Sequence, residues 1–184
     1  MYDDKRKSDK HNPNGYYELN KGFIIKNLMN AKFNPDTYKD KAIKITSYGL
    51  KFLPKGDYKI LYMKRDIYEI WKSQENMRNK LLSVNISGEE MREILRKTEN
   101  HILSKLDKRE DISVLLVSYS NLLSNSVSCE KELRRISKFL TFDVSKGKNA
   151  IDTRLYRCRA KSTDTLSESE EEVIKERLKQ LGYL

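Results

Sequence analysis

The sequence predicts a single α/β domain in which helices cover both faces of a mostly parallel sheet. Two short apolar runs, Tyr58–Met63 and Ile112–Val117, have the length of buried strands. Segments with the apolar spacing of helices follow each run, and strands that alternate with helices form parallel sheets. A chain of 184 residues is long enough for one such domain and short for two. Residues 1–184 are therefore expected to form one unit.

The N-terminal part is expected to contain an arm, a helix and a short strand. Residues 1–15 are polar and charged, which is typical of an exposed arm. Apolar residues at helical spacing predict an amphipathic helix from about Asn20 to Phe33, ended by a turn at Asn34. A short strand is expected over Ala42–Thr46.

The strand Tyr58–Met63 and the helix after it form the most informative segment. The strand is almost continuously apolar, which predicts burial on both of its faces. Arg65 ends the apolar run, and Asp66 is a residue type that caps helix N-termini. Trp71 falls on the apolar stripe of the helix and is expected in the core.

Two further helices are expected around the second strand. A helix over Ser87–Lys108 begins with a capping box in which Glu90 is the partner of Ser87. Another is expected over Ser128–Leu140. Residues 163–184 are interpreted as a serine-rich acidic linker and a C-terminal helix. The residues expected to form the buried stripe of the first of these helices are Met91, Ile94, Leu95, Thr98, Ile102 and Leu106.

The composition favours anionic partners other than nucleic acid. A net charge of +10 attracts nucleotides and other anions. The lysines are scattered, without the interleaved aromatic residues of a nucleic-acid platform, so most of this charge is interpreted as a contribution to solubility.

Cysteine use and hydropathy indicate a reducing, cytoplasmic location. Cys129 and Cys158 are too few and too far apart for a disulfide framework or a zinc site. The sequence contains no apolar run near the roughly 20 residues that span a bilayer, and its N-terminus has no hydrophobic segment of signal-peptide type.

Arg65 and Ser73 are spaced to hold an anion. Ligands of open α/β sheets bind beyond the carboxyl ends of the strands, where Arg65 is expected. Ser73 lies about 2.2 helical turns further on, roughly 12 Å of rise, which a guanidinium that bends back along the helix can span. The alternative is an ordinary strand-to-helix junction with a solvated arginine.

Arg65, Asp66 and Ser73, after the strand KILYM, resemble the 3′-phosphate-binding motif of sulfotransferases. These enzymes transfer a sulfuryl group from 3′-phosphoadenosine 5′-phosphosulfate (PAPS). Nearly the whole chain resembles their bacterial branch, in the same order. The matching segments are HNPNGYYE, KAIKITSYGLKFLP, VLLVSYSNLL, CEKELRRISKFL, IDTRLYRCR and KERLKQLGYL. The resemblance implies a three-layer α/β/α fold of the P-loop NTPase type, PAPS as donor, a hydroxyl or amine acceptor, and no metal.

The resemblance also implies which residues contact the nucleotide. Tyr119, just beyond the second strand, matches a tyrosine near the adenine nucleotide, and a late basic segment is expected to close over it. The alternatives are a partly buried tyrosine and a solvated basic loop. The implied nucleotide-binding residues are Arg65, Ser73, Tyr119, Arg154, Arg157 and Arg159.

The catalytic base is less clearly implied. Ser47 aligns with the histidine that takes the acceptor proton in the cytosolic branch, and serine is a poor base at neutral pH. Other branches use a glutamate, for which Glu18 is the nearest candidate. Lys44 is a candidate to stabilise the transferring group. For Glu18 the alternative is a surface or helix-start residue.

One family feature has no counterpart in this sequence. Sulfotransferases begin with a strand and a glycine-rich loop, of the form PRSGTS, that cradles the 5′-phosphosulfate. No such loop occurs in these 184 residues, so the resemblance implies an N-terminally incomplete chain. Loss of that central strand is expected to leave the neighbouring strands with unpaired edges. The alternatives are a non-catalytic, sulfotransferase-like remnant that binds a nucleotide or a protein partner, and a nucleotide kinase, which also needs a phosphate loop.

Overall fold

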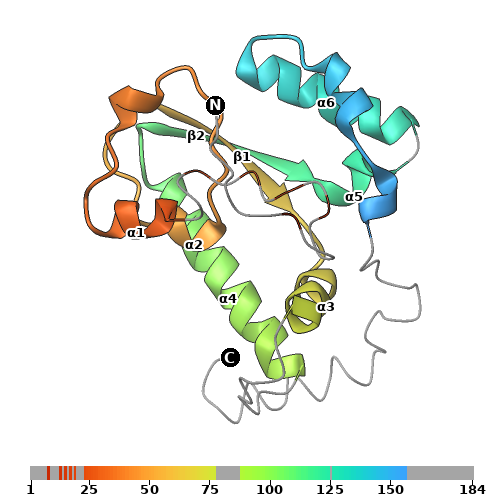
Figure 1. The fold of residues 1–184 in the computed structure, drawn as a ribbon, viewed down its shortest axis with the longest axis horizontal. Helices are drawn as coiled ribbons and strands as arrows, with labels where there is room; N and C mark the ends of the chain where they lie inside the picture. Colours follow the sequence, from red (N-terminus) through yellow and green to blue (C-terminus); the bar gives the residue numbers. More distant parts are fainter. Residues whose placement is uncertain are drawn as a thin grey trace.

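The computed structural model describes residues 23–77, 88–124 and 126–156, with single residues at 8, 13, 15, 17 and 19. The described chain is mixed α/β, with one parallel sheet of two strands (Figure 1). The elements, in order, are α1 (Ile24–Met29), the 3₁₀ helix η2 (Pro35–Tyr38), α2 (Ser47–Leu50), β1 (Tyr58–Lys64), α3 (Ile67–Met77), α4 (Gly88–Asp107), β2 (Ile112–Ser118), α5 (Tyr119–Leu122), α6 (Ser126–Leu140), and the 3₁₀ helices η3 (Ser145–Ala150) and η4 (Thr153–Leu155).

The two strands run parallel and end at the same edge of the sheet. Tyr58 lies opposite Ile112 at one end, and Lys64 lies opposite Ser118 at the other. The helices α3 and α4 belong to the connection between the strands. The predicted parallel arrangement is therefore confirmed for these two strands, and it brings the residues after both strands to one place.

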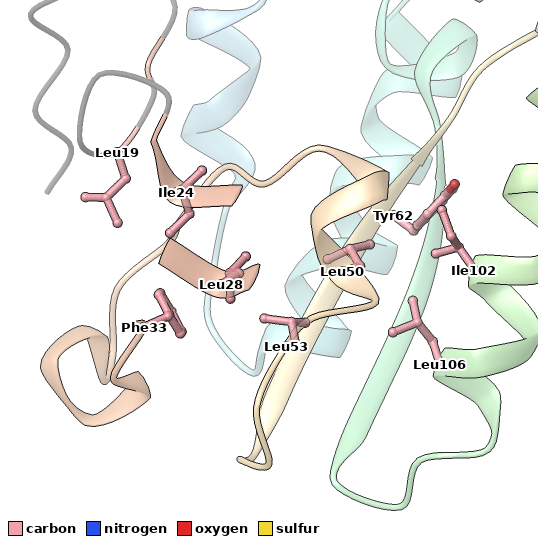
Figure 2. Close-up of a cluster of buried hydrophobic side chains, with 9 residues drawn as sticks. All are labelled: Leu19, Ile24, Leu28, Phe33, Leu50, Leu53, Tyr62, Ile102 and Leu106. Carbon is pink, nitrogen blue, oxygen red and sulfur yellow. The ribbon is translucent and has the colours of Figure 1, made fainter. Parts of the chain in front are cut away.

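The main core lies where α1, α2, β1 and α4 converge (Figure 2). Ile102 and Leu106 of α4 are each only 2% exposed. Leu28 and Leu50 bring in the two short N-terminal helices. Burial of such side chains is the main favourable term in folding. The buried members of the core are Leu19, Ile24, Leu28, Phe33, Leu50, Leu53, Tyr62, Ile102 and Leu106.

The helix α6 contacts β2 on the side away from α4 (Figure 1). Val117 of β2 is fully buried, and Ile136 of α6 is 8% exposed. Arg135 donates a hydrogen bond from Nη2 to the carbonyl oxygen of Leu116 at 3.1 Å. Its Nη1 donates to both carboxylate oxygens of Glu132, at 2.9 and 2.8 Å. Apolar contact and a charged hydrogen-bond network therefore join α6 to the strand.

The predicted strand Ala42–Thr46 is wrong. Residues 41–46 have no regular secondary structure, and within the described chain they pair with neither strand. Ile43 and Ile45 instead pack against the main core. An alternating apolar pattern shows which side chains are buried, but it does not show whether the backbone pairs with a strand. Here the alternation reflects burial of Ile43 and Ile45 without strand pairing.

The first helix is shorter than the predicted Asn20 to Phe33. α1 ends at Met29, and Ala31 then has a φ of 53°, in the left-handed region that ends helices. The amide of Lys32 closes the turn by donating to the carbonyl oxygen of Asn27 at 2.8 Å. The expected turn at Asn34 is confirmed, since its side chain accepts a hydrogen bond from the amide of Asp36 at 3.0 Å.

Burial on α4 agrees in part with the predicted stripe, since Ile102 and Leu106 are buried as predicted. The helix itself is confirmed, as Gly88–Asp107, although Ser87 lies outside the described residues. Thr98 is exposed and Ile94 is 48% exposed, whereas the neighbouring Glu99 is only 8% exposed. A carboxylate was not expected on the buried face, and it is there because Lys64 of β1 donates a hydrogen bond to it.

Burial of β1 on both faces is also not observed. Tyr62 is 8% exposed, but Met63, which points to the opposite face, is 46% exposed. Trp71 is half-buried and packs against Gly88, where an added Cβ would lie 2.9 Å from its ring. No helix in the described part of the chain has the length and apolar character to cross a membrane.

Arg109 fixes the two loops that enter the strands. Its Nη1 and Nη2 donate to the carbonyl oxygens of Leu53 and Pro54 at 2.7 and 2.8 Å. Its Nε donates to Oδ1 of Asp111 at 2.9 Å, and the amide of Gly56 donates to Oδ2 of Asp111 at 2.9 Å. The Arg109 hydrogen bonds, and next the Gly56 amide, hold the pKa of Asp111 well below its ordinary value.

The lowered pKa of Asp111 makes a prediction about acid stability. A carboxyl group with a depressed folded-state pKa stabilises the fold above its unfolded-state pKa, about 4, and this stabilisation is lost as the pH falls towards the folded-state value. Asp111→Asn is expected to lower the melting temperature at neutral pH and to flatten its decline between about pH 5 and pH 2. Calorimetry across this range measures both effects. Glu110→Gln, at an exposed neighbouring carboxylate, is the control and should leave the curve unchanged.

Candidate functional site

The candidate site lies at the shared carboxyl edge of the strands, where Arg65 follows β1. Asp66 caps α3 as expected, because its Oδ1 accepts hydrogen bonds from the amides of Tyr68 and Glu69 at 2.8 and 3.2 Å. The chain therefore turns directly from strand into helix, and Arg65 is held at the junction.

Two tyrosine rings and a carboxylate surround the Arg65 guanidinium. Its Nε donates to Oε2 of Glu69 at 3.0 Å, and its side chain is 21% exposed. Its central carbon lies 4.9 Å from the ring centroid of Tyr119 and 5.8 Å from that of Tyr156. The two rings contact each other edge to face at 5.4 Å. Cation–π contacts of this kind are favourable and orient a guanidinium.

Glu69 is the centre of this cluster. Its side chain is only 5% exposed, and a buried carboxylate is costly unless it is paired and hydrogen-bonded. Besides the bond from Arg65, its Oε1 accepts a hydrogen bond from the Tyr156 hydroxyl at 2.5 Å. One carboxylate thus connects β1, α3 and the segment after η4.

This arrangement leaves the outer part of the guanidinium available. Among the described residues, Arg65 donates its hydrogen bond through Nε, and both Nη atoms can still donate. A pair of Nη donors suits two oxygens of a phosphate or sulfate group. Because Glu69 and the rings already fix the side chain, little conformational entropy is lost when an anion binds.

Ser73 lies further along the same face of α3. Arg65, Glu69 and Ser73 follow one another at intervals of four residues, a spacing that aligns side chains on a helix. Ser73 is half-buried. In this structure the guanidinium reaches Glu69, one turn before the serine, and within the described residues no contact joins Arg65 to Ser73.

Tyr119 lies where the sequence predicted, directly after β2, and its ring contacts Arg65. The side chain of Arg154 is instead 88% exposed, and its Nε and Nη2 donate to Asp152, each at 2.9 Å. Arg154 is therefore paired with Asp152, and within the described residues no contact joins it to Arg65. Arg157 and Arg159 lie outside the described residues.

Sequence reasoning missed Glu69 and Tyr156. Glu69 occupies the third helical position, where an acidic residue is an ordinary partner of a helix N-terminus. Tyr156 stands among arginines in the segment IDTRLYRCR, where the positive charge is the more prominent feature. The signal in the sequence was an aromatic residue with a hydroxyl group inside a basic segment, because a tyrosine that packs against the domain needs a partner for that hydroxyl.

A second polar cluster lies near Ser47, one of the predicted catalytic residues. Ser47 is exposed and begins α2, near Tyr62 of β1. Burial, and next the nearby Glu99 carboxylate, raise the pKa of Tyr62, while the Ser47 hydroxyl acts in the opposite direction. Lys44 is exposed in the preceding coil. Glu18 lies outside the described residues.

The described residues contain no group of three or more His, Cys, Asp or Glu side chains arranged to hold a metal ion. Cys129, on α6, is a buried free thiol. The chain matches no protein-family model, no characterised protein and no solved structure.

The Tyr156 hydroxyl is predicted to contribute to stability through Glu69. Tyr156→Phe keeps the ring but removes a hydrogen bond to a buried carboxylate, and such bonds contribute roughly 1.5 kcal/mol. The free energy of unfolding, measured by urea denaturation, should fall by about this amount. Tyr48→Phe is the matched control, because Tyr48 is 46% exposed. Equal stability of the two variants would contradict the role given to the Tyr156–Glu69 bond.

Proposed function

We propose that this chain binds PAPS and transfers its sulfuryl group to a hydroxyl or amine acceptor, on a three-layer fold of the P-loop NTPase type. The observation that supports the proposal most is the orientation of Arg65. It lies at the carboxyl edge of a parallel sheet, where ligands of α/β folds bind, with Glu69 and two tyrosine rings fixing its guanidinium.

The 3′-phosphate of the donor would accept hydrogen bonds from the Nη atoms of Arg65. The Ser73 hydroxyl, on the same helical face, would donate to another of its oxygens. Tyr119 and Tyr156 would border the adenosine with their rings. The basic residues Arg154, Arg157 and Arg159 are proposed to close over the nucleotide, which for Arg154 requires release from Asp152.

Sulfuryl transfer needs positioned groups more than covalent chemistry. As in phosphoryl transfer, an in-line displacement spreads negative charge over the equatorial oxygens, which cations stabilise. Lys44 is a proposed cation for this role. A base must also take the acceptor proton, with Glu18 and Ser47 as the candidates from sequence. The geometry of the described residues supports the 3′-phosphate end of the donor site.

The second candidate is a non-catalytic protein that binds the nucleotide without transferring from it. Binding alone would need only the anion-binding donors of Arg65, which is the part of the proposed site with the clearest geometry. Both candidates require the Arg65 site, so nucleotide binding tests what they share, and sulfate transfer separates them.

Calorimetric titration tests the 3′-phosphate site. The wild-type protein should bind adenosine 3′,5′-bisphosphate more tightly than adenosine 5′-monophosphate. Arg65→Ala should weaken bisphosphate binding about 10- to 100-fold, since charge-assisted hydrogen bonds to phosphate are lost. It should also abolish the preference over the monophosphate. The preference isolates the 3′-phosphate from every other contact.

Arg96→Ala is the matched control, because Arg96 is a partly exposed arginine paired with Glu93 on α4. It should change neither affinity. Absence of bisphosphate binding by the wild type, or an unchanged preference in Arg65→Ala, would contradict the proposed site. Ser73→Ala should reduce the preference by a smaller factor than Arg65→Ala.

A further inference from the structure

The outward face of α6 carries a row of exposed side chains, most of them basic. The helix contacts β2 and buries Cys129 and Ile136 (Figure 1). At 3.6 residues per turn, the positions four, seven and eleven residues after Val127 lie on the same side of the helix as Val127, opposite to Ile136. These positions are all exposed. The residues of this row are Val127, Lys131, Arg134 and Lys138.

The three cations of the row have no carboxylate partner among the described residues. Lys131 and Lys138 form no ion pair there, and Arg134 donates from Nε to the backbone carbonyl oxygen of Glu130 at 3.4 Å. The adjacent carboxylate of Glu130 is paired with Lys148 instead, at 2.8 Å. The row therefore presents three charges to solvent that the described fold does not neutralise.

Other helical cations of this chain are paired at the spacing that the row leaves to like charges. Arg96 pairs with Glu93, and Arg135 with Glu132, each three residues apart on its helix. Like charges at intervals of three or four residues destabilise a helix by mutual repulsion. An external anion would relieve this repulsion in α6, so the row is suited to a negatively charged partner.

An exposed apolar side chain lies near each end of the three cations. Val127 is 71% exposed and Phe142 is 61% exposed, which makes them the two most exposed large apolar side chains in the described part of the chain. Val127 precedes Lys131 by about one turn. Phe142 directly follows the residue that ends α6, Thr141, whose φ is 65°. Apolar groups that face water are unfavourable, and a partner that covers them would gain from their burial.

An anionic lipid surface matches both properties of this face. Headgroup phosphates and carboxylates attract lysine and arginine, and apolar side chains beside them can enter the boundary between headgroups and acyl chains. A single-stranded nucleic acid would match the charge alone. Its binding sites also offer aromatic rings among the cations, and the row contains none.

We propose that the outward face of α6 binds reversibly to anionic membrane surfaces, with the three cations on the headgroups and with Val127 and Phe142 in the interface. This inference goes beyond the proposed sulfuryl transfer and does not depend on it, because no residue of the Arg65 site takes part.

Sedimentation with lipid vesicles tests the proposal. The wild-type protein should bind vesicles of roughly one third phosphatidylserine in phosphatidylcholine far more tightly than vesicles of phosphatidylcholine alone, and added salt should weaken this binding. A triple variant, Lys131→Gln, Arg134→Gln and Lys138→Gln, should bind the anionic vesicles about 100-fold more weakly, since each basic residue near such a surface contributes about fivefold.

The matched control removes the same charge outside α6. It combines Lys39→Gln, Lys55→Gln and Lys108→Gln, at three exposed lysines, and should keep most of the wild-type affinity. Melting temperatures report whether both triple variants are folded. If the α6 variant is not folded, Arg134→Gln alone takes its place, with an expected loss of about fivefold.

Phe142→Ser reports on the apolar part of the contact. It should weaken binding to the anionic vesicles and leave the salt dependence of binding unchanged, because it removes no charge. The α6 triple variant should instead show a smaller salt dependence than the wild type.

Three results would overturn the proposal. They are equal binding of both kinds of vesicle by the wild type, equal losses in the two triple variants, and tighter binding of a single-stranded oligonucleotide than of anionic vesicles through the same three cations. Each would leave the proposed sulfuryl transfer standing, because nucleotide binding is measured separately. A loss confined to the α6 variants supports the membrane-binding face.

Discussion

The ion pair between Arg65 and Glu69 is the interaction on which the candidate site depends. A carboxylate buried to this degree needs charged or hydrogen-bonded partners, and it has them in the Arg65 guanidinium and the Tyr156 hydroxyl. The requirement fixes three parts of the chain relative to one another: the end of β1, the first turn of α3 and the segment after η4. Tyr119 then packs on the same guanidinium from the end of β2. Satisfying one buried charge thereby fixes the Arg65 guanidinium at the end of β1.

Two neighbouring cations at the end of β1 belong to different clusters. Lys64 is the last residue of the strand and Arg65 follows it directly. Each pairs with a glutamate from a different helix, α4 for Lys64 and α3 for Arg65.

Sequence patterns predicted the elements that local periodicity specifies. Both strands, α3 with its Asp66 cap, α4 and α6 agree with the prediction to within a few residues. The failures involve longer-range effects. Ile43 and Ile45 alternate like a strand but contribute to a core instead of a ladder. Glu99 broke the predicted stripe of α4 because its partner, Lys64, lies 35 residues earlier. A periodicity within one helix contains no information about such a partner.

The sequence by itself determined the strand, the turn and the capped helix that place Arg65, because these depend on side chains within a few residues of one another. It also carries the resemblance on which the proposed chemistry is based. Only the tertiary structure decided what surrounds Arg65, since Tyr156 meets Glu69 across 87 residues. It likewise brought Ser47, Tyr62 and Glu99 together from a coil-to-helix junction, a strand and a long helix. The pairing of buried charges depends on which elements pack together, and packing is settled by the whole chain rather than by any segment of it.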